Sequence, residues 1–257
     1  MNRTGLLAAL AVGIGVGAVF GIFPELDLRL ARLFFDGQGG AFAFGHGAGA
    51  RLLRDAAMWI VAASAAPAVI AIVLKFLLPE RRMLIPGRAA VFLLATLALA
   101  PGLVTNGILK DQWPRSRPID VAEFGGKEHF SAWWDPHGGC GQNCSFVSGE
   151  ASGAYWMFAP AALAPAPVRP YAFAAAAVFG TAVGVKRMAF GGHFASDVLF
   201  AGVFTFLVIW LVHALIYRWP FTRLSDETVE AVIARAAAPV HRHVRALLRR
   251  VAGGERA

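Results

Sequence analysis

Six apolar stretches, separated by polar segments, organise the chain. Each approaches the roughly 20 apolar residues that a helix needs to cross a lipid bilayer. They cover residues 6–23, 56–78, 89–109, 147–164, 171–185 and 195–217. The pattern predicts an all-α polytopic membrane protein with six transmembrane helices in a bundle. Because the first stretch ends only weakly in small residues, we expect it to be a retained anchor rather than a cleaved signal peptide.

Composition agrees with this pattern. Of the 257 residues, 57% are hydrophobic and only 16% are charged, and the mean hydropathy is +0.57. Such values exclude an ordinary soluble domain of this length. The fourth and fifth stretches are rich in alanine and contain glycine, as is typical of membrane helices that pack closely.

The distribution of lysine and arginine predicts which ends face the cytoplasm, because short cytoplasmic loops carry the excess. Six spans place both termini on one side, and that side carries Arg3, Arg81, Arg82, Arg88, Arg169 and an arginine-rich tail. We therefore expect cytoplasmic termini. The other side carries Arg29, Arg32, Arg51 and Arg54, which are offset by Glu25, Asp27, Asp36 and Asp55.

The net charge of +8 raises the question of a nucleic-acid partner. We exclude this class, because the charge is divided between the tail and one cluster on the opposite side, without a basic helix interleaved with stacking aromatics. We divide the chain into a membrane domain, residues 1–220, and a basic amphipathic tail, residues 221–257. The sequence of the tail predicts a helix that is capped by Ser225 and interrupted by Pro239. We expect this helix to lie on a surface of anionic lipid.

Two regions between the spans are polar. Residues 24–55 predict an amphipathic interfacial helix followed by a glycine-rich surface loop, and His46 in that loop has no assigned role. Residues 111–146 form a longer loop whose tryptophans predict a position at the membrane surface. This loop contains Cys140 and Cys144, for which we favour a disulfide in an oxidising space. Zinc binding with His137 and free thiols are the alternatives.

Candidate chemistry lies in three clusters at span ends on one side of the membrane. Lys110 and Arg117 end the third span, and offer a point charge and a planar fork suited to phosphate oxygens. Arg115 stands between them and is assigned to the same anion site. Ser148 and Gly149 begin the fourth span, where free backbone N–H groups favour an anion.

The third cluster is the sequence GVKRMAFGGHFASD, between the fifth and sixth spans. Ionisable residues at such positions are usually functional. Arg187 adds a second planar guanidinium group that can bind phosphate oxygens. His193 and Asp197 stand four residues apart, so on a helix the carboxylate could accept the imidazole N–H and orient the ring. Donors around an oriented histidine suit phosphoryl transfer, in which positioning and charge neutralisation do most of the catalysis.

The three clusters together resemble the signature of the type 2 phosphatidic acid phosphatase superfamily. KDQWPRSRP matches K-x6-RP, Ser148-Gly149 matches the core of P-S-G-H, and residues 186–197 match S-R-x5-H-x3-D. The resemblance implies that His193 attacks phosphorus to form a phosphohistidine and that Asp197 orients it. It implies that phosphate is held by Lys110, Arg117, Ser148, Gly149 and Arg187, and that no metal or cofactor is required. A bacterial inner-membrane location with the site facing the periplasm is also expected.

The chain departs from this signature at three positions. Val147 replaces proline and Lys186 replaces serine, and we expect both to be tolerated. Glu150 replaces the histidine that protonates the leaving group, so it must turn away, pair with a cation such as Arg115, or carry a proton. A weakened general acid favours a good leaving group. We therefore expect the substrate to be the 1-phosphate of lipid A, as in the lipid A 1-phosphatases of the family.

Several functions share this signature. Within enzymes, the alternatives are an undecaprenyl diphosphate phosphatase, a phosphatidylglycerophosphate phosphatase and a lipid phosphotransferase. Outside enzymes, a catalytically silent lipid-binding or transport protein is the alternative. The predicted partners are a phosphorylated membrane lipid and the bilayer, with no obligate protein partner.

Overall fold

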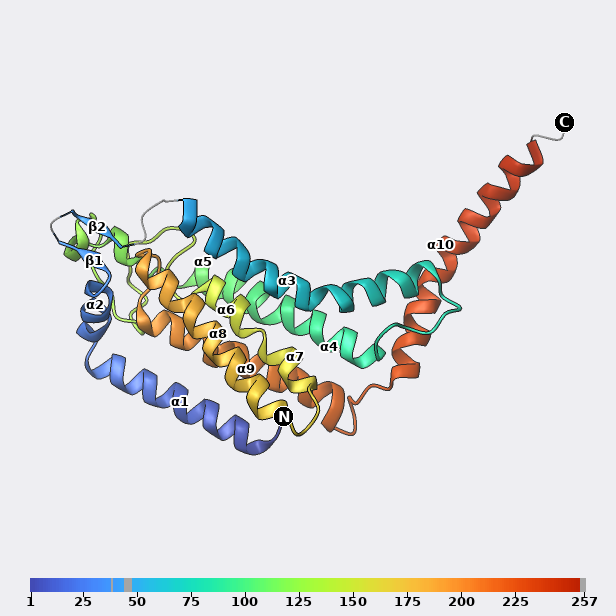
Figure 1. Ribbon diagram of the computed structural model, residues 1–257, viewed down its shortest axis with the longest axis horizontal. Helices are drawn as coiled ribbons and strands as arrows, with labels where there is room; N and C mark the ends of the chain where they lie inside the picture. The colour runs from blue at the N-terminus through green and yellow to red at the C-terminus, as the bar shows by residue number, and fades with distance from the viewer. Residues whose placement is uncertain (38, 44–47, 255–257) are drawn as a thin grey trace.

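The computed structural model describes residues 1–37, 39–43 and 48–254, and these are mostly helical (Figure 1). Part of the glycine-rich loop, with His46, lies outside the described residues. The long elements are α1 (Arg3–Ile22), α3 (Ala48–Leu77), α4 (Gly87–Leu97), which continues as η1 (Ala98–Leu109) and α5 (Lys110–Gln112), α8 (Arg169–Ala189), α9 (Ala195–His213), which continues as η4 (Ala214–Arg218), and α10 (Asp226–Gly254). The short helices are α2 (Glu25–Arg32), η2 (Pro118–Asp120), η3 (Ala122–Phe124), α6 (Gly149–Tyr155) and α7 (Phe158–Leu163).

Five of the six predicted spans are present as helices long and apolar enough to cross a membrane. Within the described residues they are Arg3–Ile22, Asp55–Leu77, Gly87–Gln112, Arg169–Ala189 and Ala195–Arg218. The remaining stretch, residues 147–164, forms α6 and α7 with a turn between them instead of one helix. Pro160 explains the break, because it has no N–H for the carbonyl of Trp156 and its ring clashes with that carbonyl. The prediction of an all-α membrane bundle is confirmed, with one span broken.

The broken pair α6–α7 lies at the centre of the bundle against α8 and α9 (Figure 1). α1 packs on the outer side of α9, and α3 and α4 cover the opposite side. Two glycines of α8 allow this close approach: a Cβ on Gly180 would overlap the ring of Tyr155, and one on Gly184 would overlap Val198. The fully buried Trp156 donates from Nε1 to Thr96 Oγ1 at 3.0 Å, and so ties the break to α4.

One end of the bundle is capped by α2, a two-stranded hairpin and the long loop (Figure 1). The strands are β1 (Phe35–Asp36) and β2 (Ala41–Phe42), with Phe35 paired to Phe42. The rings of Phe35, Phe42 and Phe124 meet edge to face at centroid distances of 5.1 to 5.3 Å. Trp133 donates to the carbonyl of Gly17 at 3.3 Å, so the loop is fixed to α1. This cap covers the end at which α8 stops and α6 and α9 begin.

The opposite end is contacted by the first part of α10. Lys75 pairs with Glu230 at 3.0 Å, and Arg88 pairs with Asp226 at 3.2 Å. Ser225 caps the helix by accepting from the Thr228 N–H at 3.1 Å. The predicted interruption at Pro239 is wrong, because α10 continues through this residue. The later part of α10 extends away from the bundle (Figure 1), and its role on a lipid surface remains a prediction.

Candidate active site

Backbone hydrogen bonds join the three predicted clusters at the capped end. The N–H of Ile119 donates to Gly191 O at 3.0 Å, which links the first cluster to the third. The N–H of Ser148 donates to Asp197 O at 3.3 Å, which links the second to the third. Gly191 adopts φ +66°, and a Cβ there would overlap the ring of Phe42, so a glycine is needed at this turn. Segments far apart in sequence therefore form one site.

His193 is buried, with 2% of its side chain exposed. Its Nδ1 lies 2.7 Å from the carbonyl oxygen of Ser145. A carbonyl only accepts, so Nδ1 carries the proton and Nε2 keeps a lone pair. Burial lowers the pKa of His193 well below its ordinary value, and the positive charges of Arg187, Arg117 and Lys110 lower it further. A neutral ring in one tautomer is the form that a nucleophile requires.

Asp197 does not hold His193 directly, as the spacing of four residues had suggested. Its Oδ2 is 4.0 Å from His193 Nδ1, beyond hydrogen-bond distance. That oxygen accepts instead from Ser145 Oγ at 2.5 Å and from the Phe194 N–H at 2.8 Å. The carboxylate therefore fixes Ser145, and the carbonyl of Ser145 orients the imidazole.

Arg115 was predicted to hold the anion or to pair with Glu150, and both expectations are wrong. Its side chain is fully buried, and it donates to Asp197 Oδ1 at 2.6 Å and to Asp27 Oδ2 at 2.8 Å. Burial opposes its charge, but the two carboxylates more than offset this and raise the pKa of Arg115 above its ordinary value. We call Asp27, Arg115 and Asp197 the buried ion network. It is a support for the site, not a contact for substrate.

Asp27 contacts the site residues, which the sequence did not predict. It was read as a surface charge offsetting nearby arginines, yet it is 1% exposed. Its two oxygens accept from the backbone N–H of Ser196 at 2.9 Å and from Ser196 Oγ at 2.6 Å. Asp27 lies 88 positions from Arg115, and no spacing rule connects them. The available signal was a carboxylate flanked by leucines in α2.

Lys110 and Arg117 meet at the loop that contains the cysteines. Lys110 Nζ donates to Asn143 Oδ1 at 2.9 Å, and Arg117 donates to the carbonyl of Asn143 from Nε at 3.1 Å and from Nη2 at 2.5 Å. Asn143 has φ +51°, which asparagine tolerates better than most residues. The structure joins Cys140 and Cys144 in a disulfide with a Cα–Cα distance of 5.7 Å. This short ring presents Asn143 to both cations.

Glu150 contacts two cations of the third cluster. Its Oε2 lies 3.1 Å from Lys186 Nζ, and its Oε1 lies 3.4 Å from Arg187 Nη1. Of the three alternatives for Glu150, pairing with a cation is the one observed, with partners other than Arg115. Two departures from the family signature, at positions 150 and 186, are thus in contact with each other. Gly192 makes room for Arg187, since a Cβ there would lie 2.5 Å from Nη2.

Ser148 and Gly149 act through local geometry. Ser148 is buried, and its Oγ caps α6 by accepting from the Ala151 N–H at 3.4 Å. A Cβ at Gly149 would lie 2.7 Å from Asn106 Oδ1 and 3.2 Å from Lys110 Cε. Glycine therefore allows the start of α6 to lie against Lys110. In the part of the chain described here, no cluster of three or more His, Cys, Asp or Glu residues could hold a metal ion.

The fold and the site define a membrane phosphatase, in which a fixed neutral histidine lies among cations at one end of a helical bundle. The chain belongs to the PAP2 superfamily, whose sequence profile matches residues 89–221, and within it to the membrane lipid phosphatase branch. It is 37% identical over 224 residues to a lipid A 4'-phosphatase of Francisella tularensis subsp. novicida, covering 85% of this chain and 98% of that protein. It is 33% identical over 213 residues to a lipid A 4'-phosphatase of Rhizobium leguminosarum, covering 77% and 90%. No solved structure matches the chain.

Proposed function

We propose that the protein hydrolyses the 4'-phosphate of lipid A through a phosphohistidine on His193. The observation that carries the proposal is the state of this residue: neutral, fixed through Nδ1 by the carbonyl of Ser145, and surrounded by three cations. The names of the relatives support lipid A as the substrate and the 4'-position over the 1-position. The site residues named below have the roles we assign to them within this proposal.

In the first step, Nε2 of His193 forms a bond to phosphorus as the bond from phosphorus to the sugar oxygen breaks. Lys110, Arg117 and Arg187 neutralise the charge that develops on the phosphoryl oxygens. The ring becomes positively charged, and the carboxylate of Asp197, 4.0 Å from Nδ1, stabilises that charge. In the second step, the oxygen of water forms a bond to phosphorus as the bond from phosphorus to Nε2 breaks. Inorganic phosphate leaves, the ring is again neutral, and the proton from water returns to the amine of Lys186 that protonated the leaving group in the first step.

The leaving group decides between the two phosphates of lipid A. The 1-phosphate was expected because Glu150 replaces the proton-donating histidine of the family. However, Glu150 lies 3.1 Å from the ammonium of Lys186, which supplies a proton donor in its place. A sugar hydroxyl at the 4'-position, a poorer leaving group than the anomeric hydroxyl, can then depart in protonated form. This removes the chemical reason for preferring the 1-phosphate.

The orientation follows from the distribution of basic residues. Arg81, Arg82 and Arg88 lie at the end of the bundle remote from His193, where α10 also packs. By the positive-inside rule this end faces the cytoplasm, and the site faces the periplasm of a bacterial inner membrane. The substrate would therefore be met in the periplasmic leaflet. No metal or cofactor takes part in the proposed reaction.

The test uses purified full-length protein and two monophosphoryl forms of lipid A, one with the 1-phosphate and one with the 4'-phosphate. We expect phosphate release from the 4'-form and none from either form with His193→Ala. In wild-type protein, labelled 4'-phosphate should give an acid-labile, base-stable protein adduct. Release from the 1-form alone would overturn the positional assignment. Release only from undecaprenyl diphosphate or phosphatidylglycerophosphate, included in the panel, would overturn the substrate.

A further inference from the structure

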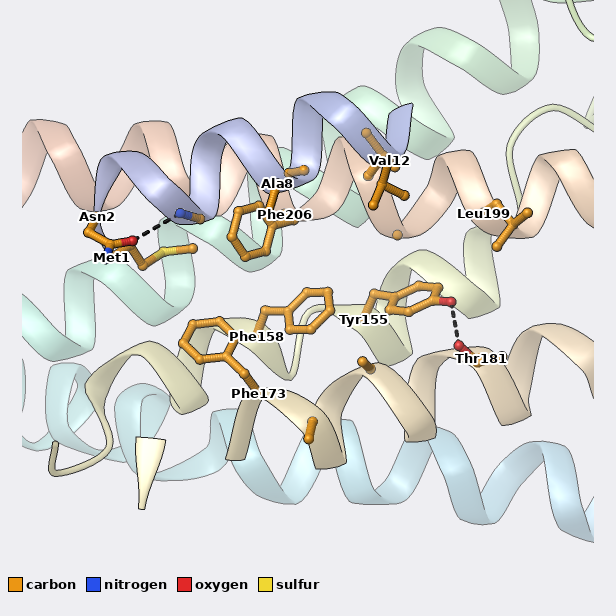
Figure 2. A pocket seen from close by; sticks show the side chains of 16 residues that line it. Met1, Asn2, Ala8, Val12, Tyr155, Phe158, Phe173, Thr181, Leu199 and Phe206 are labelled. Carbon is orange, nitrogen blue, oxygen red and sulfur yellow. Dashed lines mark hydrogen bonds between the residues drawn. The ribbon is translucent and has the colours of Figure 1, made fainter. Parts of the chain in front are cut away.

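An apolar cavity of about 580 Å³ lies between α1, the α6–α7 pair, α8 and α9 (Figure 2). Its wall includes Val12, Phe158, Phe173 and Phe206. Aromatic rings from α7, α8 and α9 lie around it, and Tyr155 and Thr181, joined by a hydrogen bond of 2.9 Å between Oη and Oγ1, form part of its wall (Figure 2). The catalytic residues are not among its lining residues.

The cavity extends from the end of the bundle remote from His193 past the middle of the membrane: at the start of the chain and along α1 it is lined from Met1 to Val12, and on α9 from Leu199 to Phe206, in the half of that span nearer His193. On α8, Arg169 and Arg187 are separated by 18 residues, or about 27 Å of helix, close to the thickness of a bilayer's hydrocarbon core. The lining residues Phe173, Ala174 and Ala177 are on the Arg169 side of this helix. Along α1 the lining extends from Asn2 to Val12, about 15 Å, the depth of one leaflet. The lining residues Met1 and Asn2 place one end of the cavity at the end of the bundle remote from His193, where a lipid of that leaflet can insert an acyl chain.

Cationic side chains gather at the outer end of the cavity. Asn2, which lines the cavity, accepts from Trp210 Nε1 at 2.9 Å, and the guanidinium of Arg218 lies 4.4 Å from the Trp210 ring centroid. Arg169 is one helical turn from the lining residue Phe173. Arg169 and Arg218 both act electrostatically on His213. Arg169 and Arg218 are not lining residues themselves, but they lie next to the residues that line the outer end of the cavity.

The cationic group, which consists of Arg169 and Arg218, has no neutralising carboxylate among the described residues. Neither Arg169 nor Arg218 forms an ion pair there, and no described acid is among the charges acting on His213. Arg218 Nε and His213 Nδ1 are buried atoms without a hydrogen-bond partner in the described part of the chain. Arg88 Nε at the same end is also without a partner, but Lys75 and Arg88, unlike Arg169 and Arg218, are paired with carboxylates of α10. Buried donors without acceptors call for a further partner, and two cations without a carboxylate favour an anion as that partner.

We propose that this site binds one anionic phospholipid from the leaflet opposite the active site. One acyl chain occupies the cavity, and the phosphate accepts hydrogen bonds from Arg169 and Arg218. Apolar volume for a chain of one leaflet's length, together with uncompensated cations at its mouth, is the pattern that such a lipid matches. The lipid joins α1 to α8 and α9, and so stabilises the bundle without taking part in the reaction.

Native mass spectrometry of the full-length protein, with phosphatidylglycerol or phosphatidylcholine of identical chains, tests the proposal. We expect one phosphatidylglycerol to remain bound under conditions that remove phosphatidylcholine. Arg169→Gln with Arg218→Gln should lower retention of phosphatidylglycerol at least tenfold. Ala177→Phe, which fills the cavity, should lower retention of both lipids. Arg235→Gln, which removes an exposed arginine of α10, is the matched control and should leave retention unchanged.

A second measurement needs no variant and guards against misfolded proteins. Phosphatidylglycerol with a photoreactive group on its acyl chain is crosslinked to wild-type protein, and the peptides are mapped. We expect labels on residues 1–12 and 173–181. Labels confined to other surfaces, or equal retention of the two lipids by wild-type protein, would overturn the proposal.

Discussion

Two groups of charges lie within the same site and differ in how they are compensated. The buried ion network has one arginine between two aspartates, all with 0 to 1% of the side chain exposed. The cradle, which we define as Lys110, Arg117, Glu150, Lys186 and Arg187, has four cations and one carboxylate. Its members contact Asn143 or each other and remain partly open to solvent. We therefore expect the buried ion network to fix the geometry of the site and the cradle, with its excess of positive charge, to hold an anion.

The largest effect is expected at His193, which belongs neither to the buried ion network nor to the cradle. His193→Ala removes the proposed nucleophile and should lower kcat by about 10³-fold or more, because a neighbouring group is not expected to replace it. Binding of substrate should be little affected, since the cradle remains. Phosphate release and equilibrium lipid binding measure the two. Substantial turnover by the variant would exclude a phosphohistidine on this residue.

The second effect concerns the buried ion network. Asp27→Asn leaves Arg115 with one carboxylate in a buried setting, and removal of one partner from such a group costs about 3–5 kcal/mol of unfolding free energy. We expect a lower thermal stability in detergent and reduced kcat. Glu25→Gln is the control, since this neighbour in α2 forms only a 4.0 Å exposed contact with Arg29 and should change stability by less than about 1 kcal/mol. Equal stability of the two variants would contradict a supporting role for Asp27.

A third prediction tests the contact between Glu150 and Lys186 in the cradle. Lys186→Met removes the proposed proton donor and should lower kcat on the 4'-phosphate about 10²-fold. The decrease in kcat should be smaller on an aryl phosphate ester, because its leaving group needs little protonation. The double variant Glu150→His with Lys186→Ser restores the family signature and should recover activity relative to Lys186→Met. Equal losses on both substrates would rule out proton donation.

The smallest effect is on the pH profile. The pKa of His193 is held well below its ordinary value by burial and by three cations, so activity should persist below pH 6.5 and fall only at lower pH. Arg117→Gln removes one of these charges and should shift the acidic limb of kcat/KM upward. The stability of the fold should also decrease in acid. His193 has a higher pKa in the unfolded chain than in the folded protein, so protonation favours unfolding as pH falls below about 6.5. An acidic limb that does not move in Arg117→Gln would contradict this electrostatic cause.

Much of the fold was predictable because a bilayer imposes a long and simple pattern. The five long spans follow directly from apolar length, whereas the break between α6 and α7 depends on one proline and on the burial of Trp156. Asn143, Ser145 and Asp27 could not have been predicted as parts of the site. Their roles depend on backbone carbonyls and on contacts between distant segments, which leave no periodic or spaced signature.

The residues of the third cluster lie together in the structure, but their contacts differ from those that spacing predicted. Spacing placed His193 and Asp197 one turn apart, but His193 precedes the helix, so its ring turns to the carbonyl of Ser145 instead. Arg115 resembled its neighbours Lys110 and Arg117 in sequence. Arg115 differs from these two residues only in the structure, where its side chain is buried against the carboxylates of Asp27 and Asp197.

The contact between Asp27 and Arg115 sets the smallest piece of this protein that could work alone. The family profile begins at residue 89, so a domain cut to the conserved core would lack α2 and one of the two carboxylates that compensate Arg115. Such a fragment would bury an arginine with too little negative charge around it. We therefore expect a fragment that retains activity to include α2, and truncations should begin before residue 25.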